Sequence, residues 1–498
     1  MLHVLAQVPI ARPGGRSLVF WPLAPELVLT GTALVLMLFD ALRPSEDQRP
    51  VVAISLVGIA GAAAASVYLW SWTTKPGRPL TVLGGMVAAD HFAVFLRLTL
   101  LGVAFLAVLL SYQYLEGSAE YRPEYYPLLL FATAGMTLFV SSNDLIMVFL
   151  ALEILSLSLY LMTGFSFRRL GSAEASMKYF LLGAFSSAFF LYGVALAYGA
   201  TGTTNLTLIA RSLNGVTGTA ALALGAAGLL AVGFAFKVAA VPFHMWTPDA
   251  YQGAPTCVTA FMSAGTKVAA FGALLRVFMV GFNPLIWDWK PFVWVLAAVT
   301  MVVGSVLAIA QTDVKRMLAY SSIAHAGFIL VGVSAADQAG MRASMFYLVA
   351  YATMILGAFG VVMLVSQRGE AATGLRSYAG LSRRSPWLAV VLALLLLSLA
   401  GIPPTAGFIA KVVVFTAAEQ AGHWPLVLIA VLSSVIAAFF YLRVIVLMYM
   451  QEPEESTEIE PSAVGRFVVA VTAALTLLFG VAPQILLHFL DSASVIRF

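Results

Sequence analysis

The chain has little charge and almost no cysteine, and these scarcities exclude several large classes of protein. Only 10% of its 498 residues are charged, whereas soluble proteins carry about 25%. A single cysteine, Cys257, excludes a disulfide framework and a cysteine-ligated iron–sulfur cluster. The six histidines are scattered without the spacing of metal ligands. No two glycines lie two positions apart, which excludes the dinucleotide-binding fingerprint, so any redox chemistry belongs to a partner.

Long apolar runs are abundant instead. Hydrophobic residues make up 61% of the chain, and its mean hydropathy is +0.95. Because about 20 apolar residues cross a bilayer, this length predicts about fourteen spans. They lie near 19–41, 51–72, 89–112, 125–142, 144–165, 173–200, 218–241, 255–280, 291–311, 317–335, 341–366, 386–417, 424–450 and 464–489. The predicted fold is an all-α polytopic membrane protein, with residues 1–498 in a single membrane domain.

The basic residues predict how the chain is oriented. His3, Arg12 and Arg16 precede the first full span without forming a cleavable signal peptide. With fourteen spans both termini share one side, and lysine and arginine are in excess in the loops of the other side. The loops with that excess carry Arg43, Arg49, Arg122, Arg168, Arg169, Lys315, Arg316, Arg368, Arg376, Arg383, Arg384 and Arg466. We expect a multi-pass protein of the bacterial inner (plasma) membrane with both termini outside, and no nucleic-acid surface.

Two spans are interrupted at comparable places. The first reads GFAFKVAAVPFHMWTPDAYQGAP, where Pro242 lacks an amide donor and clashes with the carbonyl four residues back. The second reads LLLLSLAGIPPTAGFIAKVVVF, where Gly401, Pro403 and Pro404 stop one half-helix. Carbonyls freed at membrane depth are tolerated only where protein or a watery cavity satisfies them. A packing kink is the alternative reading of each proline.

The matched breaks predict an internal repeat. Five spans within 125–280 correspond to five within 291–450, each with the interrupted helix in fourth place. An odd number of spans per unit makes the two repeats inverted relative to the membrane. Residues 1–124 would form a three-helix segment before the repeats, and 464–498 a helix after them.

Several polar segments are expected at the membrane surface. Residues 373–384 alternate arginines with apolar residues, which is typical of a short interfacial helix. An acidic stretch is expected to be a solvated loop, or else a contact for a cytoplasmic partner: Glu452, Glu454, Glu455, Glu458 and Glu460. Four charged residues near span ends are expected to be interfacial anchors: Arg97, Asp144, Arg276 and Arg443.

Five ionisable side chains lie within apolar spans: Glu153, Lys178, Lys237, Lys267 and Lys411. A charge at the bilayer centre costs roughly 2.5–3.5 kcal/mol on insertion scales. Such residues indicate a chain that moves ions or protons. Lys237 and Lys411 flank the two breaks, where half-helix ends supply oriented dipoles and hold water. Removing an amine from water disfavours its charged form, so a lysine there can release a proton.

The other candidates extend this path. Glu153 needs a cation or a proton, and if it pairs with Lys237 the two titrations are coupled. Lys178 could tune that pair. Lys267 follows small residues in FMSAGTKVAAF that leave room for water. His325 in SSIAHAGF lies at a comparable depth of the second repeat, and a neutral imidazole can accept one proton while donating another, so it suits a link between Lys267 and Lys411.

Each candidate also has a purely structural reading. Glu153 could belong to a structural ion pair, and Lys178 could extend its amine to the interface. The three deeper lysines could be structural as well. His325 could be a core histidine with satisfied hydrogen bonds, and His244 could merely cap the first broken helix.

Three long segments carry a family resemblance: SMKYFLLGAFSSAFFLYGVALAYGATGTTNL (176–206), FKVAAVPFHMWTPDAYQGAP (236–255) and AGIPPTAGFIAKVVVF (400–415). They closely resemble the subunit N family of bacterial NADH–quinone oxidoreductase, respiratory complex I, and its counterparts, chain 2 of mitochondrial and plastid complexes. The match covers essentially the whole chain. Related families include the other antiporter-like subunits of that enzyme and of multi-subunit sodium/proton antiporters.

The resemblance implies fourteen spans, inverted repeats with broken seventh and twelfth helices, and a proton path along a central polar axis. Glu153 matches the fifth-helix glutamate of the family, and Lys178, Lys237 and Lys267 match the lysines of the sixth, seventh and eighth helices. Lys411 matches the twelfth-helix lysine, where a related subunit carries glutamate. NADH, FMN, iron–sulfur clusters and quinone are implied to be held by other subunits, with none in this chain.

The sequence hypothesis is a proton-translocating membrane-arm subunit of that enzyme, a translocase whose partners are neighbouring antiporter-like subunits. Lys237 would exchange its proton with Lys267, His325 would relay it, and Lys411 would deliver it outward. Two alternatives stay open. A sodium/proton antiporter subunit is disfavoured because sodium sites use clustered oxygen ligands and this path is dominated by lysines. A structural member of the membrane arm is the other.

Overall fold

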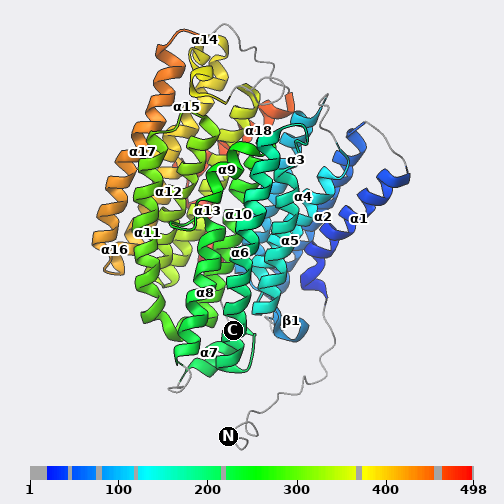
Figure 1. Ribbon diagram of the computed structural model, residues 1–498, viewed down its shortest axis with the longest axis vertical. Helices are drawn as coiled ribbons and strands as arrows, with labels where there is room; N and C mark the ends of the chain where they lie inside the picture. The colour runs from blue at the N-terminus through cyan, green and yellow to red at the C-terminus, as the bar shows by residue number, and fades with distance from the viewer. Residues whose placement is uncertain are drawn as a thin grey trace, which may run out of the picture.

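The computed structural model describes residues 20–42, 47–74, 81–116, 122–214, 220–365, 373–453 and 463–495 (Figure 1). Part of the orientation prediction therefore lies outside the described residues: His3, Arg12, Arg16, Arg43 and Arg368. Most of the acidic stretch lies outside them too, namely Glu454, Glu455, Glu458 and Glu460. Glu452 is described, and its carboxylate accepts hydrogen bonds from Arg383 at the surface.

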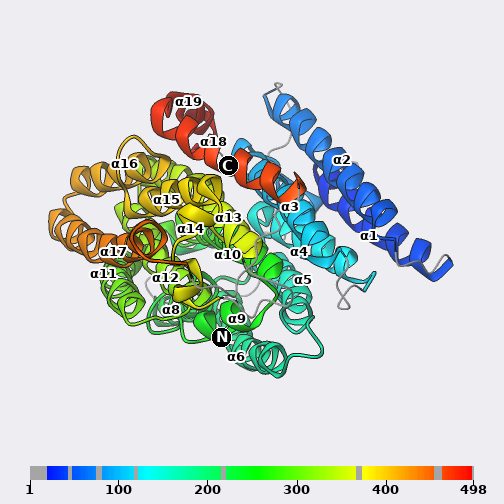
Figure 2. The same ribbon diagram turned by 90° about the horizontal axis from the view of Figure 1, so that it is seen from above.

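The N-terminal segment contains three long helices and a small hairpin. Its elements are η1 (Trp21–Leu23), α1 (Ala24–Leu42), α2 (Arg49–Thr73), β1 (Thr81–Val82), η2 (Leu83–Gly85), β2 (Val87–Ala88) and α3 (His91–Leu115). The two strands are antiparallel, with Thr81 opposite Ala88. The Asp90 carboxylate caps α3 by accepting the Ala93 amide at 2.8 Å. Helices α1 and α2 lie at one edge of the molecule (Figure 2).

The first repeat follows. It contains α4 (Tyr125–Ser141), α5 (Leu145–Thr163), α6 (Leu170–Thr201), α7 (Leu206–Leu213), α8 (Ala220–Val238), α9 (Trp246–Gly253) and α10 (Thr256–Arg276). A π-turn, η3 (Val277–Gly281), and a 3-10 turn, η4 (Asn283–Leu285), lead into the second repeat.

The second repeat and the C-terminal helices complete the chain. They are α11 (Ile286–Ile309), α12 (Val314–Ala335), α13 (Gln338–Val365), η5 (Leu375–Tyr378), α14 (Leu381–Arg384), α15 (Pro386–Ala400), α16 (Ala406–Gln420), α17 (Trp424–Met450), α18 (Ala463–Val481) and α19 (Gln484–Ala493). The predicted interfacial helix over 373–384 is instead two short helices. Gly380, with φ of +62°, adopts the left-handed conformation between them.

The helices confirm the predicted number of spans. In the described part of the chain, twelve helices are long and apolar enough to cross a membrane. The shorter apolar helices Tyr125–Ser141 and Pro386–Ala400 supply the other two of the fourteen spans. The last predicted span ends early, because the chain turns at Ala482 and Pro483 and continues as the separate helix α19.

A pair of matching hydrogen-bonded turns supports the inverted repeat. At the start of α5, the Asp144 carboxylate caps the helix and accepts the Thr204 hydroxyl at 2.7 Å. At the start of α12, the Asp313 carboxylate caps the helix and accepts the Thr373 hydroxyl at 2.5 Å. We call these two arrangements the aspartate clasps. Since α5 and α12 are the second helices of repeats that run in opposite directions, the clasps lie on opposite faces, near α7 and near α14 (Figure 1).

A pair of arginines repeats the same correspondence. Arg276 on α10 donates to the Val140 carbonyl at the end of α4, at 3.0 Å. Arg443 on α17 donates to the Ile309 carbonyl at the end of α11, at 2.8 Å. Each arginine therefore joins the last helix of its repeat to the first. The domain limits predicted from the sequence stay a prediction, but both repeats are closed in the same way.

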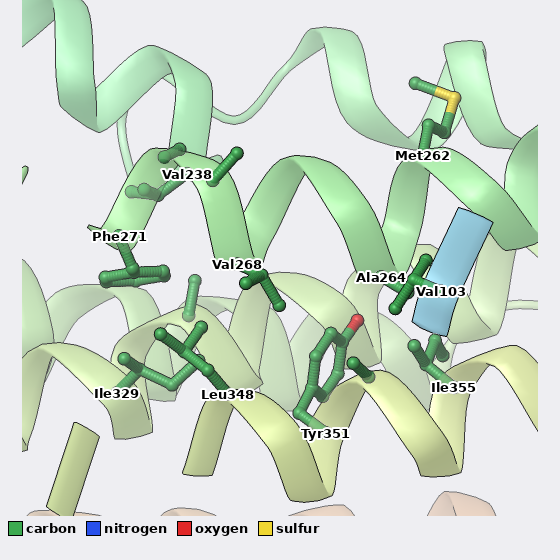
Figure 3. Packing of buried hydrophobic residues seen from close by; sticks show 14 of the residues in the cluster. Val103, Val238, Met262, Ala264, Val268, Phe271, Ile329, Leu348, Tyr351 and Ile355 are labelled. Atoms are coloured by element: carbon green, nitrogen blue, oxygen red, sulfur yellow. The ribbon is translucent and has the colours of Figure 1, made fainter. Parts of the chain in front are cut away.

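The core lies where the two repeats meet. The apolar stretch of α10 is completely buried, and those of α12 and α13 nearly so. Val268 and Phe271 of α10 pack near Ile329 of α12 and Leu348 of α13 (Figure 3). Figure 2 places α10 and α13 near the middle of the bundle. Polar side chains on these helices are therefore shielded from lipid on every side.

Candidate functional site

Hydrogen bonds from other elements stabilise the end of the first broken helix. Helix α8 ends at Val238, and Ala239 takes the left-handed conformation with φ of +61°. The Lys267 amine, from α10, donates to the freed Val238 carbonyl at 2.9 Å. The Trp246 indole donates to the Phe236 carbonyl at 3.0 Å. These bonds satisfy groups that a helix end at membrane depth would otherwise leave unpaired.

A lysine amine also stabilises the end of the second broken helix. Helix α15 ends at Ala400, and Gly401 follows with φ of +91°. The Lys411 amine, in the second turn of α16, reaches back to the Ala400 carbonyl at 2.7 Å. In both breaks a lysine amine therefore lies at the carboxyl end of a half-helix, where the partial negative charge of the helix dipole stabilises a cation.

Lys237 has different neighbours from those expected beside the break. Its amine donates to the Ser156 hydroxyl of α5 at 2.8 Å and to the Tyr179 hydroxyl of α6 at 3.3 Å. The Tyr179 ring stacks on Trp246, with the ring centroids 4.4 Å apart. Lys237 is buried, and both of its partners are neutral. The structure brings it to the α5–α6 face of α8, close to the candidate Glu153.

The direct ion pair between Glu153 and Lys237 does not form. Glu153 is half-buried and accepts the Ser187 hydroxyl of α6 at 2.5 Å. Ser156, one turn further along α5, takes the Lys237 amine instead. Glu153 remains close enough for its charge to act on Lys237. A carboxylate without direct contact still makes the charge states of the two residues depend on each other.

Lys178 lies in an exposed ion-pair cluster and contacts neither Glu153 nor Lys237. Its amine is 2.7 Å from the Glu174 carboxylate and 3.0 Å from Asp249 on α9. Asp249 also accepts Arg316 from α12 at 2.7 Å. The side chain of Lys178 is 47% exposed, so the amine reaches the interface as a long side chain near a helix end can. Asp249 thereby joins the two repeats on the face where α9 begins.

His325 is the centre of a cluster of hydroxyls. Its Nδ1 lies 2.7 Å from the Tyr347 hydroxyl, and its Nε2 lies 3.2 Å from the Tyr441 hydroxyl. Tyr441 in turn shares a short hydrogen bond with Ser321. One ring nitrogen of a neutral imidazole donates and the other accepts, so the ring can pass a proton between the two tyrosines.

Lys411 is connected to this cluster through Phe328. The Lys411 amine lies over the Phe328 ring, 4.7 Å from its centroid, and the same ring packs 5.8 Å from the His325 ring. The charges of Lys267 and Lys411 both act on His325. Lys267, His325 and Lys411 are all buried and lie close enough for their charges to interact. His244 lies at the first break, half-buried, and its carbonyl accepts the Thr247 amide.

The structure corrects the interpretation of two arginines as surface anchors. Arg97 is completely buried and donates to Glu26 at 2.8 Å and to Ser141 at 3.0 Å. Arg276 is completely buried and makes two hydrogen bonds of 2.8 Å to Asp90. The Arg276–Asp90 ion pair and the Arg97–Ser141 hydrogen bond join the N-terminal segment to the first repeat, whereas the Arg97–Glu26 ion pair lies within the N-terminal segment. The positions of the two arginines within their spans predicted how deep they lie in the membrane. They did not predict that protein, rather than lipid headgroups, surrounds each side chain.

Sequence reasoning missed the hydroxyl groups around the lysines and the histidine. They are Ser156, Tyr179, Ser321, Tyr347, Tyr351 and Tyr441. Tyr347 and Tyr351 are four residues apart on α13, so they share one face of that helix. That spacing was the available signal. In the part of the chain that the structure describes, no group of three or more His, Cys, Asp or Glu side chains could hold a metal ion.

Comparison with known proteins identifies the family to which this chain belongs. A family model described as "NADH:quinone oxidoreductase/Mrp antiporter, TM" matches residues 142–437. A relative from Parafrankia sp. (strain EAN1pec), named NADH-quinone oxidoreductase subunit N, is 46% identical and aligns over 99% of this chain and 98% of its own length. The chain belongs to the subunit N family of NADH–quinone oxidoreductases. The resemblance inferred from three sequence segments is thereby confirmed.

Solved structures agree with the subunit N family. A chain of respiratory complex I from Thermus thermophilus is 36% identical, with a TM-score of 0.79 over 93% of this chain and 98% of that one. A chain of the Mrp complex from Dietzia sp. DQ12-45-1b superposes with a TM-score of 0.81 over 96% and 97%, at 22% identity. The second match shows a common fold. The predicted all-α fold with broken helices and inverted repeats is confirmed.

Proposed function

We propose that this chain is a proton-translocating membrane-arm subunit of an NADH–quinone oxidoreductase. Family membership supports the assignment to this enzyme, and one structural observation supports the role in proton translocation. Lys237, Lys267 and Lys411 are buried, and the partners of their amines in the described ranges are neutral hydroxyls and carbonyls. A buried amine without a carboxylate can exist in its neutral form, because no uncompensated charge stays behind when the proton leaves.

The proposed path runs from Lys237 to Lys267, then through His325 to Lys411. Lys237 lies before the first break, and the Lys267 amine bonds the carbonyl of the next residue, Val238, so both lysines belong to the same helix end. His325 lies close enough to both Lys267 and Lys411 for the charges of the two amines to act on it. Glu153 lies close enough for its charge to interact with that of Lys237.

Lys178 has a separate place in this proposal. With Asp249 and Arg316 it forms the exposed end of the path, on the face where the orientation rule places the cytoplasm. Its ion pairs connect α6 to α9, which carries Trp246 and so the ring stacked on Tyr179. A change of charge at this cluster would be transmitted to a hydrogen-bond partner of Lys237.

The redox chemistry is assigned to partner subunits. NADH, FMN, iron–sulfur clusters and quinone would be bound elsewhere in the complex, and quinone reduction would drive changes in charge and hydration that reach this chain. Neighbouring membrane-arm subunits, especially antiporter-like ones, are the proposed partners. The proposed location is the bacterial plasma membrane, multi-pass, with both termini outside.

The test uses the assembled complex reconstituted in vesicles. Lys237→Ala and Glu153→Gln should lower NADH-driven proton pumping and, with it, coupled quinone reduction. The fall should be about tenfold or more for Lys237→Ala, since a positioned proton donor contributes roughly 10²–10⁴-fold to a transfer step. Lys290→Ala, near the start of α11, is the control and should pump normally.

Three results would redirect the proposal. Normal activity and normal proton-to-electron ratio in both variants would refute it. Sodium-dependent fluxes in vesicles without NADH would favour a sodium/proton antiporter subunit. Unchanged pumping in Lys411→Ala, combined with loss of assembly when α18 is removed, would favour a structural role.

A further inference from the structure

The connection from Lys267 to the His325 cluster has no described protein bond. The Lys267 amine donates to the Val238 carbonyl, and the two His325 ring nitrogens contact Tyr347 and Tyr441. Among the described residues no side-chain hydrogen bond joins Lys267 to the histidine cluster. A proton moving between them needs further polar groups, because it cannot cross an apolar gap.

Two buried hydroxyls lie in this region. The Tyr351 ring packs against the His325 ring, with centroids 5.1 Å apart. Its hydroxyl points from α13 toward the stretch of α10 between Ala264 and Val268, which carries Lys267 (Figure 3). Tyr351 thus contacts the histidine with its ring and faces the lysine-bearing helix with its oxygen.

Ser322 is the second hydroxyl. It lies on α12, three residues before His325, and close to the hydroxyls of both Tyr251 and Tyr351. Within the ranges that the structure describes, neither the Ser322 oxygen nor the Tyr351 oxygen forms a well-aligned hydrogen bond, although both residues are completely buried.

Completely buried hydroxyls without protein partners are costly unless ordered water bonds them. Other buried hydroxyls of the axis differ in this respect. Tyr347 and Tyr441 bond His325, and Ser156 bonds Lys237. The two hydroxyls without such partners therefore lie beside the connection from Lys267 to the His325 cluster, which lacks a protein hydrogen bond.

We propose that the hydroxyls of Tyr351 and Ser322 hold the water that carries a proton from Lys267 to the His325 cluster. This inference rests on the proposed function and adds two relay residues to it. In the transfer, an N–H bond of the Lys267 ammonium breaks as an O–H bond forms on the bound water. Each hydroxyl accepts one proton while releasing its own, and Tyr347 or Tyr441 completes the transfer to His325. Lys267 ends neutral, His325 ends protonated, and no hydroxyl changes charge.

Tyr351→Phe tests the inference in the assembled enzyme in vesicles, because it removes one oxygen and keeps the ring packed on His325. NADH-driven proton pumping should fall about tenfold. The rate ratio between H₂O and D₂O should also rise, because this transfer becomes slower than the other steps. Ser322→Ala is the second variant and should change both readouts in the same direction. A purely structural role would leave the isotope ratio unchanged.

Tyr378→Phe is the matched control. Tyr378 is completely buried, and its hydroxyl also lacks a protein partner in the described ranges, but it lies in η5 near α14, away from the axis. It should pump normally with an unchanged isotope ratio. Equal losses in Tyr351→Phe and Tyr378→Phe would overturn the inference. Normal pumping in both Tyr351→Phe and Ser322→Ala, with Lys237→Ala impaired, would overturn it and leave the proposed function standing. Normal pumping in all of these variants would refute the proposed function too.

Discussion

Five buried cations in the described part of this protein fall into two groups with opposite surroundings. Arg97 and Arg276, at the junction of the N-terminal segment with the first repeat, each contact a carboxylate. Lys237, Lys267 and Lys411, near the broken helices, bond only neutral oxygens of the described chain. Arginine keeps its charge at all accessible pH values, whereas buried lysine changes its charge readily. The paired arginines suit a fixed joint, and the unpaired lysines suit proton exchange.

The largest effect should come from removing the partner of a paired arginine. Asp90→Ala leaves Arg276 buried without its carboxylate and should destabilise the chain by about 3–5 kcal/mol. The measurement is the thermal unfolding midpoint of the purified complex, together with retention of this subunit. Glu452→Ala, which breaks the exposed pair with Arg383, should change neither. Equal stability of the two variants would show that the buried Asp90–Arg276 pair contributes no more than the exposed Glu452–Arg383 pair.

The next effect should separate charge from proton exchange in the lysine group. Lys411→Met keeps the approximate side-chain volume but leaves the Ala400 carbonyl without its amine donor, so it should cost about 1–3 kcal/mol of stability. NADH-driven pumping should nevertheless fall about tenfold. Lys411→Arg keeps the charge but cannot release the proton, so it should not restore pumping. Full pumping in the arginine variant would show that Lys411 supplies only a fixed charge.

The smallest effect is expected at the exposed cluster. Asp249→Asn removes the carboxylate that joins Lys178 to Arg316 but keeps an oxygen able to accept one hydrogen bond. Pumping should fall by no more than about twofold at low salt and less at high salt, because salt screens exposed charges. Initial rates in vesicles at two ionic strengths measure this. A loss as large as that of Lys411→Met would place Asp249 in the path itself.

The spans and the helix breaks were predictable because both depend only on residues that are close together in the sequence. A run of apolar residues sets a span, and Pro242 and Gly401 mark breaks without reference to any other helix. The lysines at those breaks were predictable for the same reason. Lys267 and Lys411 lie where their depth along the chain places them, and the structure supplies the carbonyls that they cap.

Lateral contacts were not predictable in this way. Arg97 and Arg276 were expected at the surface because they lie near span ends, yet helices on every side bury them. Ser156, rather than Glu153, takes the Lys237 amine, and the Glu153 carboxylate accepts the Ser187 hydroxyl of α6 instead. The tyrosines around His325 come from α13 and α17, so their convergence depends on how the repeats pack.

The aspartate clasps bear on how the chain arose. Asp144 with Thr204 and Asp313 with Thr373 form the same arrangement on opposite faces of the molecule. An ancestral five-helix unit whose turns were stable in either compartment could be duplicated in tandem, with the second copy inserting upside down. The small polar turn, which uses only uncharged threonine and a helix-capping aspartate, favours neither compartment and therefore permits both insertions.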